Sequence, residues 1–188
     1  MSSKSIPMKG FLVIPVCVAA YLRFGHPPVA VADNAFPFEK QIVHVPLNER
    51  VRSEMPASAP IEASATNLTT GAQIYRAQCA SCHGLAGHAS EFGAHMYPHA
   101  PQLWSKHRNG VVGVSDDPVG ETYWKVANGI RLTGMPAFDK VLNQTQMWQV
   151  SLLLKNADKP LPVDATALTS TPIDFSLPLT TAPAVTPH

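Results

Sequence analysis

Two cysteines and a histidine lie within five consecutive residues, Cys79-Ala80-Ser81-Cys82-His83. Thiols at this spacing can each form a thioether with one vinyl group of a porphyrin, and the imidazole that follows can bind the iron. The same spacing is compatible with a redox-active dithiol, a zinc site or a disulfide. A redox dithiol needs a strand and a helix around it, and a zinc site needs a second pair of spaced ligands. Neither is evident, so the motif favours covalent haem attachment through Cys79 and Cys82, with His83 as an axial ligand.

A candidate for the second axial ligand lies downstream in Thr133-Gly134-Met135-Pro136. Electron-transfer haems use six ligands, so that no open position binds oxygen or peroxide. Gly134 lets the backbone approach a ring, and Pro136 keeps Met135 out of helical geometry. A thioether opposite a histidine raises the reduction potential of the iron. We therefore expect Met135 to be this ligand; the alternatives are Met96 or one of the loop histidines His88, His95, His99 and His107.

The two cysteines end the apolar face of a predicted helix. The residues of this face recur at helical spacing: Leu68, Ala72, Tyr75, Cys79 and Cys82. Thr70 and Gln73 have the spacing of a capping box at the start of the helix. Both thiols are thus expected to point toward the interior that the helix packs against.

Two further helices are predicted after a long loop. One follows Asp117-Pro118, with the aspartate as N-cap and the proline at the first helical position, and ends near Gly129. The next begins near Asn143, with Gln146 three residues later, and is apolar over a wide arc. Between the first two helices, residues 84–115 show no convincing helix or strand. A loop of that length needs something to fill the space it encloses, and a large apolar prosthetic group would do so.

Composition and charge exclude several classes of protein. The chain has 188 residues and a net charge of +1, which leaves no basic field for binding nucleic acid. Its three cysteines cannot build a disulfide framework. Proline accounts for 18 residues, about twice the ~5% average, and is concentrated outside the middle of the chain. One compact domain between extended flanks is therefore expected.

The N-terminal segment has the features of a signal peptide or of a short membrane anchor. Lys4 and Lys9 precede an apolar run from 11 to 22, which Pro15 interrupts, and Ala30-Val31-Ala32 offers a cleavage site. Both interpretations place the rest of the chain outside the cytoplasm. The predicted division is a signal peptide or anchor at 1–32, a linker with a possible short helix (47–55) at 33–66, a domain at 67–158, and a Pro/Thr/Ala-rich tail at 159–188 that is disordered or wraps loosely.

The segment 67–158 resembles the class I cytochromes c. Gly71 and Tyr75 match the glycine and aromatic residue at which the first helix of that family crosses the last, here near Trp148, and Pro101-Gln102-Leu103 and Met135 follow in the family's order. The resemblance implies an all-α fold, with about three main helices around one covalent haem c and extended, low-structure flanks. It also implies that the carbonyl of Pro101 accepts the second ring N–H of His83, fixing its tautomer.

Three other side chains combine reach with a hydrogen-bond donor, so they could bond the haem propionates: Trp104, Tyr97 and Arg131. The sequence thus predicts a monohaem electron carrier of the bacterial periplasm, soluble or tethered to the inner membrane. Its partners would be redox proteins, and it would have no small-molecule substrate and no enzymatic activity. The flanks leave open a haem subunit of a larger membrane-bound dehydrogenase or oxidase. A catalytic or ligand-sensing haem protein is a third class, although peroxidases of this type generally carry two C-x-x-C-H motifs.

Overall fold

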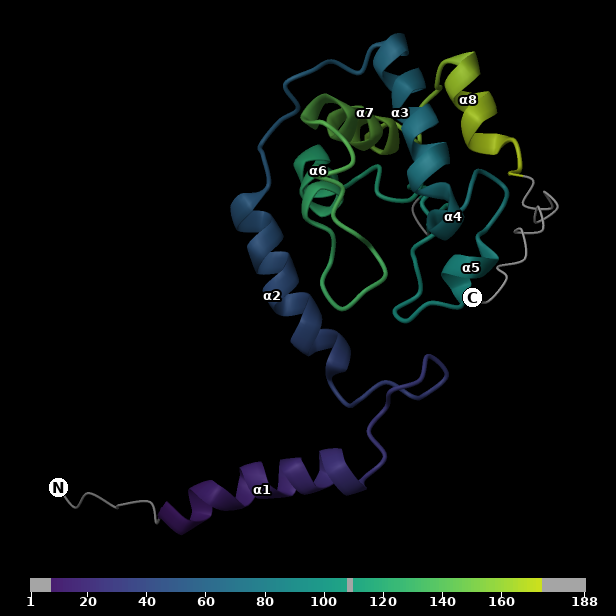
Figure 1. Ribbon diagram of the computed structural model, residues 1–188. Helices are drawn as coiled ribbons and strands as arrows, with labels where there is room; N and C mark the ends of the chain where they lie inside the picture. Colours follow the sequence, from purple (N-terminus) through teal and green to yellow (C-terminus); the bar gives the residue numbers. More distant parts are fainter. Residues whose placement is uncertain (1–7, 108–109, 174–188) are drawn as a thin grey trace, which may run out of the picture. The chain divides into compact units, whose positions relative to one another are not determined.

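The computed structural model describes residues 8–107 and 110–173 and divides the chain into two compact units, 1–49 and 50–188. Across these described residues it contains helices and two isolated β-bridges, and no strand, which confirms the all-α prediction (Figure 1). The helices are α1 (Met8–Phe24), α2 (Glu39–Glu54), α3 (Ala65–Gln78), α4 (Ala80–His83), α5 (Glu91–Ala94), α6 (Val119–Asn128), α7 (Gln144–Lys155) and α8 (Val163–Ser170).

The first unit contains α1 and most of α2. Helix α1 continues through Pro15, and its apolar side chains from Val13 onward are exposed. In the described part of the chain, no helix is long and apolar enough to cross a membrane. The assignment of residues 1–32 to a signal peptide or anchor stays a prediction.

Helices α3 and α7 cross at Gly71. A Cβ atom at this position would lie 2.3 Å from the main-chain oxygen of Gln149, so only glycine permits the close approach. Tyr75 and Leu153 are fully buried beside the crossing. The predicted capping box of Thr70 and Gln73 is wrong, because α3 begins earlier: the Ser64 hydroxyl caps it by accepting from the Asn67 amide, which leaves Thr70 and Gln73 in the helix interior.

The last two predicted helices form as α6 and α7. The capping box at Asn143 and Gln146 is confirmed, with reciprocal bonds of 2.9 Å. Gly129 ends α6 with φ +65°, also as predicted. The predicted N-cap of α6 is wrong by one residue, since Pro118 occupies that position and the side chain of Asp117 makes no capping bond. The long loop is less irregular than expected, because Ser90 caps the single turn α5.

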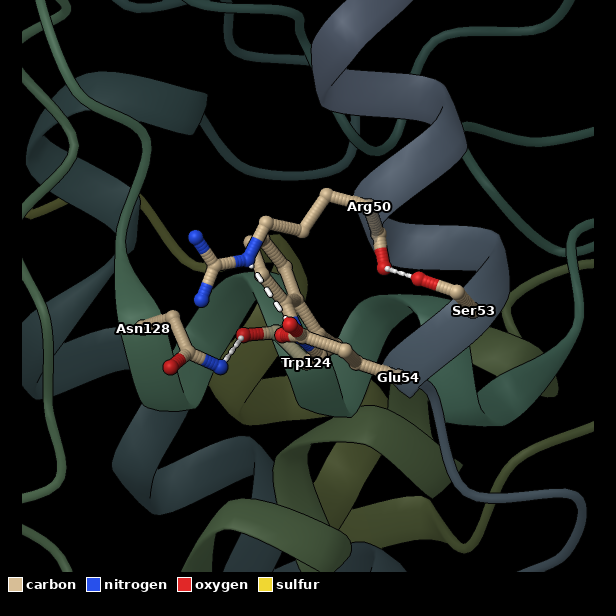
Figure 2. A network of polar contacts seen from close by, with 5 residues as sticks. All are labelled: Arg50, Ser53, Glu54, Trp124 and Asn128. Atoms are coloured by element: carbon tan, nitrogen blue, oxygen red, sulfur yellow. Dashed lines mark hydrogen bonds and ion pairs between the residues drawn. The ribbon is translucent and has the colours of Figure 1, made fainter.

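The flanks contain more helix than the sequence predicts. Helix α2 begins at Glu39, not near 47, and its last turn, residues 50–54, belongs to the second unit. In that turn Val51 is buried and Glu54 accepts a 3.0 Å bond from the indole of Trp124 (Figure 2). Helix α8 forms where a disordered tail is predicted, because Ala165 and Thr169 are buried within the second unit. The rest of the tail, 174–188, lies outside the described residues.

Candidate haem-binding site

The two cysteines lie on one short turn at the end of α3. Cys79 ends α3 with φ −117° and ψ −34°, and α4 places Cys82 and His83 on the following turn. Both thiols are free and partly buried. Burial, reinforced by the neighbouring Cys82, raises the pKa of Cys79 to about 12, so this group is a neutral thiol near pH 7. The turn therefore presents two thiols and one imidazole close together.

The imidazole of His83 is oriented by the carbonyl of Pro101. The Nδ1 atom lies 2.8 Å from this oxygen, and because a carbonyl can only accept, Nδ1 carries the proton. Burial lowers the pKa of His83, an effect that the bond to Pro101 opposes in part. The ring is thus held neutral with the lone pair on Nε2, the form that binds a metal.

The main chain after His83 is fixed by a buried tyrosine. The Tyr75 hydroxyl donates to the oxygen of Gly84 at 2.7 Å and lies 3.3 Å from that of His83, which also accepts from the Leu103 amide at 3.2 Å. Gly84 has φ +70°, and a Cβ atom there would lie 2.7 Å from the oxygen of His88. The chain can therefore reverse tightly after the histidine only with glycine at this position.

Gln102 is a site residue that the sequence analysis did not single out beyond its place in the Pro-Gln-Leu loop. Its amide nitrogen donates to the oxygens of Cys82 (3.2 Å) and Ala100 (3.1 Å), and its oxygen accepts from the Ser90 amide at 2.7 Å. One side chain thus ties the second cysteine to two points of the long loop, Ser90 and Ala100. The sequence offers no other signal for this role, because each partner is a main-chain atom.

Met135 lies in a loop that meets the loop containing Met96. The side chain of Met135 is partly buried against the core, and its amide donates to the Thr133 hydroxyl at 3.1 Å. A Cβ atom at Gly134 would lie 1.9 Å from the terminal carbon of Met96, so the two loops touch at this glycine. Both candidate thioethers therefore come from loops in contact, and Met135 is the one packed against the core.

The three candidate propionate donors differ in burial. The indole N–H of Trp104 is buried without a hydrogen-bond partner among the described residues, and its ring packs nearly perpendicular to that of Tyr75, with the ring centroids 5.7 Å apart. Arg131 and Tyr97 are exposed. A buried donor left unpaired costs about 1–3 kcal/mol, so Trp104 fits a site that receives a carboxylate acceptor from a bound group.

The loop histidines His88, His95, His99 and His107 are exposed. Within 8–107 and 110–173, no group of three or more His, Cys, Asp or Glu side chains is placed to hold a metal ion. The Nδ1–H of His95 donates to the carbonyl of Glu91 in its own turn, at 2.8 Å. The structure thus gathers Cys79, Cys82, His83 and Pro101 into one site, with Met135 and Trp104 on the surrounding core.

Comparison with known families identifies this same segment. Residues 66–152 match the family described as cytochrome C oxidase, cbb3-type, subunit III. The match begins one residue before the predicted domain and ends within α7, so it covers the C-x-x-C-H turn, the long loop and Met135. A comparison with curated proteins found no match.

Proposed function

Residues 66–152 form a class I c-type cytochrome domain with one covalently bound haem c, and from this premise we propose that the protein transfers single electrons with His83 and Met135 as axial ligands. The bound haem supplies the one-electron Fe(III)/Fe(II) couple. The observation that carries the proposal is the 2.8 Å contact between His83 Nδ1 and Pro101, which leaves Nε2 as the free donor atom.

The residues of the turn have distinct roles in this proposal. Cys79 and Cys82 provide the thioether sulfurs, and Pro101 holds the imidazole of His83 in one tautomer and orientation. This bond also increases the basicity of the ligand nitrogen. Because the ring is fixed before the electron arrives, the site needs little rearrangement between the two oxidation states.

Met135 completes the coordination in the proposal, and Trp104 binds a propionate. Met135 packs against the core, which supports its assignment as a ligand that stays in place in both oxidation states. The unpaired, buried N–H of Trp104 supports a hydrogen bond to a carboxylate. Arg131 and Tyr97 remain candidates for the second propionate, because their exposed side chains retain the necessary reach.

The proposed docking surface for redox partners is apolar. Leu132 is 83% exposed and Phe92 66% exposed, and they lie two residues before Gly134 and four residues before Met96, the residues at which the two loops touch. Leu132 also adopts φ +64°, a left-handed conformation that costs a non-glycine residue about 1–2 kcal/mol. Strain at an exposed apolar residue beside the ligand loop supports a functional role for it. The partners would be redox proteins of the bacterial periplasm, reached in soluble form or through tethering by residues 1–32.

A second candidate function is that of a non-catalytic haem subunit in a membrane-bound dehydrogenase or oxidase complex. The description of the matching family, a subunit of a cytochrome oxidase, favours it. Helices α2 and α8 lie wholly outside the matched residues, and in this proposal they attach the domain to the complex. Purification from native membranes separates the two candidates, since a stoichiometric second subunit supports the complex and a free monomer supports the carrier.

Carbon monoxide binding tests electron transfer against catalysis or sensing. A ferrous protein with both axial positions taken by His83 and Met135 should leave the absorption spectrum unchanged on mixing with carbon monoxide at neutral pH. Fast formation of a carbon monoxide complex would show an open position, and the protein would then belong with catalytic or ligand-sensing haem proteins.

A further inference from the structure

Helix α8 lies beyond the residues that match the cytochrome family and packs on the haem-attachment helix. Figure 1 shows it beside α3, with α7 on the other side of α3. Ala165 and Thr169 are buried at 0% and 2% exposure, and Leu161, Leu168 and Ile173 pack against the core. The helix therefore belongs to the folded domain, although the family match ends before it.

Arg76 binds the C-terminal end of α8 from within α3. Its guanidinium donates to the carbonyl oxygens of Leu168 (2.9 Å), Thr171 (2.6 Å) and Pro172 (3.2 Å). These oxygens lie at the end of a helix, where main-chain carbonyls lack partners and carry partial negative charge. One arginine thus satisfies three acceptors, a geometry that a lysine cannot reproduce.

A second contact joins α8 to the other side of the attachment turn. The Ala86 amide donates to the main-chain oxygen of Thr169 at 2.8 Å. Arg76 is three residues before Cys79, and Ala86 is three residues after His83. Both contacts end on the last residues of α8 and those that follow it, so one short segment holds the chain on both sides of the C-x-x-C-H turn.

We propose that α8 and Arg76 form a clasp that holds the haem-attachment turn from both sides and so positions the ring of His83. The clasp consists of Arg76, the carbonyls of Leu168, Thr171 and Pro172, and the bond from Ala86 to Thr169. Arg76 acts in this proposal as a positioning residue, since it acts on the ligand through the main chain. The inference rests on the proposed function, because it assigns the clasp a consequence for an axial ligand.

The test compares Arg76→Ala and Arg76→Lys with the control Arg50→Ala in the full-length, haem-loaded protein. Arg50 is also a paired surface arginine, bonded to Glu54 at 2.8 Å in the last turn of α2. Two readouts are used: hydrogen exchange of the Ala86 amide, and the NMR shifts of the haem methyl groups in the ferric state. Those shifts depend on the orientation of the axial imidazole ring.

In Arg76→Ala, exchange at Ala86 should accelerate roughly tenfold or more, as expected when charge-assisted bonds are lost locally. The core amide of Leu153 should keep its wild-type rate, and the haem methyl shifts should move. In Arg76→Lys, the exchange rate at Ala86 and the haem methyl shifts should lie between those of Arg76→Ala and wild type. If the alanine variant does not fold, the lysine variant is used for the test. Arg50→Ala should match wild type in both readouts.

Equal acceleration at Ala86 and Leu153 with unchanged methyl shifts would overturn the clasp, because Arg76 would then be a general stabiliser. Unchanged exchange at Ala86 would overturn it as well. Failure of the proposed function is seen separately, in the absorption spectrum and carbon monoxide response of the wild-type protein. The exchange rate at Ala86 does not depend on which residue is the sixth ligand.

Discussion

The chemistry of single residues in this site depends on how each polar atom is paired. Pro101 fixes the proton of His83 on Nδ1, and Tyr75 holds the main chain that follows. Burial raises the pKa of the Cys79 thiol. Trp104 is the exception, with a buried N–H that has no partner in the described part of the protein. We interpret this unpaired N–H as the donor of a hydrogen bond to a haem propionate.

Trp104→Phe should lower the reduction potential by less than the equivalent of about 1 kcal/mol, because the bond is made in both oxidation states and only its difference in strength between them changes the potential. Without the indole donor the propionate charge is less neutralised, which favours Fe(III). The measurement is a potentiometric titration followed by absorption. Trp124→Phe is the matched control, because its indole bonds Glu54 instead, and its potential should stay at the wild-type value. Equal potentials in Trp104→Phe and wild type would remove Trp104 from the site.

At the scale of elements, the site is positioned by the crossing of α3 and α7. Gly71 lets α3 approach the main chain of Gln149, and the stacked rings of Tyr123 and Trp148, 4.0 Å apart, join α6 to α7. Since α3 leads directly into the C-x-x-C-H turn, this crossing determines where the two thiols and the imidazole lie.

Gly71→Ala should destabilise the fold by about 1–3 kcal/mol, the usual cost of overpacking a tight interface. The added Cβ would meet a main-chain oxygen at 2.3 Å, and that atom cannot rotate away. Chemical denaturation followed by circular dichroism measures the change. Gln73→Ala, at an exposed position of the same helix, should leave the midpoint unchanged or raise it slightly. A neutral Gly71→Ala variant would show that the helices can separate without loss.

Asp117→Asn should stabilise the protein at neutral pH, by at most about 1 kcal/mol after solvent screening. Burial, with the nearby charge of Glu121, raises the pKa of Asp117 above 3.8, so its ionised form weakens the folded state. This penalty is present above the raised pKa and absent below 3.8, where the carboxyl is protonated in both states. Urea midpoints should therefore differ at pH 7 and converge in acid. If Asp117→Asn kept a higher urea midpoint than wild type in acid, the charge of Asp117 would not be the cause. As a control, Asp116→Asn, at an exposed position, should change the midpoint at pH 7 by less.

At the scale of the whole molecule, a feature can be predicted from the sequence when particular side chains form it. It cannot be predicted when main-chain atoms form it. The C-x-x-C-H turn, the Gly-Met-Pro loop and the Asn143–Gln146 cap are encoded in side-chain types, so the sequence reveals them. The clasp was not predictable, because Arg76 bonds main-chain carbonyls and the two fully buried residues of α8, Ala165 and Thr169, are small. The start of α2 was missed since the helix continues through Pro46.

With a net charge of +1, the molecule should show little electrostatic steering toward a partner or a second copy of itself. The electron self-exchange rate, measured by NMR, should therefore change little between about 10 mM and 1 M salt, although the Debye length falls from about 30 Å to 3 Å. Leu132→Asn should reduce this rate, whereas Val163→Asn, at an equally exposed position on α8, should not. A steep dependence on salt would contradict apolar docking.

The near-infrared absorption of the ferric protein tests the central claim most directly, because a methionine thioether bound to ferric haem gives a weak band there. We expect the band in the wild-type protein and in Met96→Ala, and its loss in Met135→Ala. A covalent haem that lacks the band in the wild type, or keeps it in Met135→Ala, would contradict ligation by His83 and Met135.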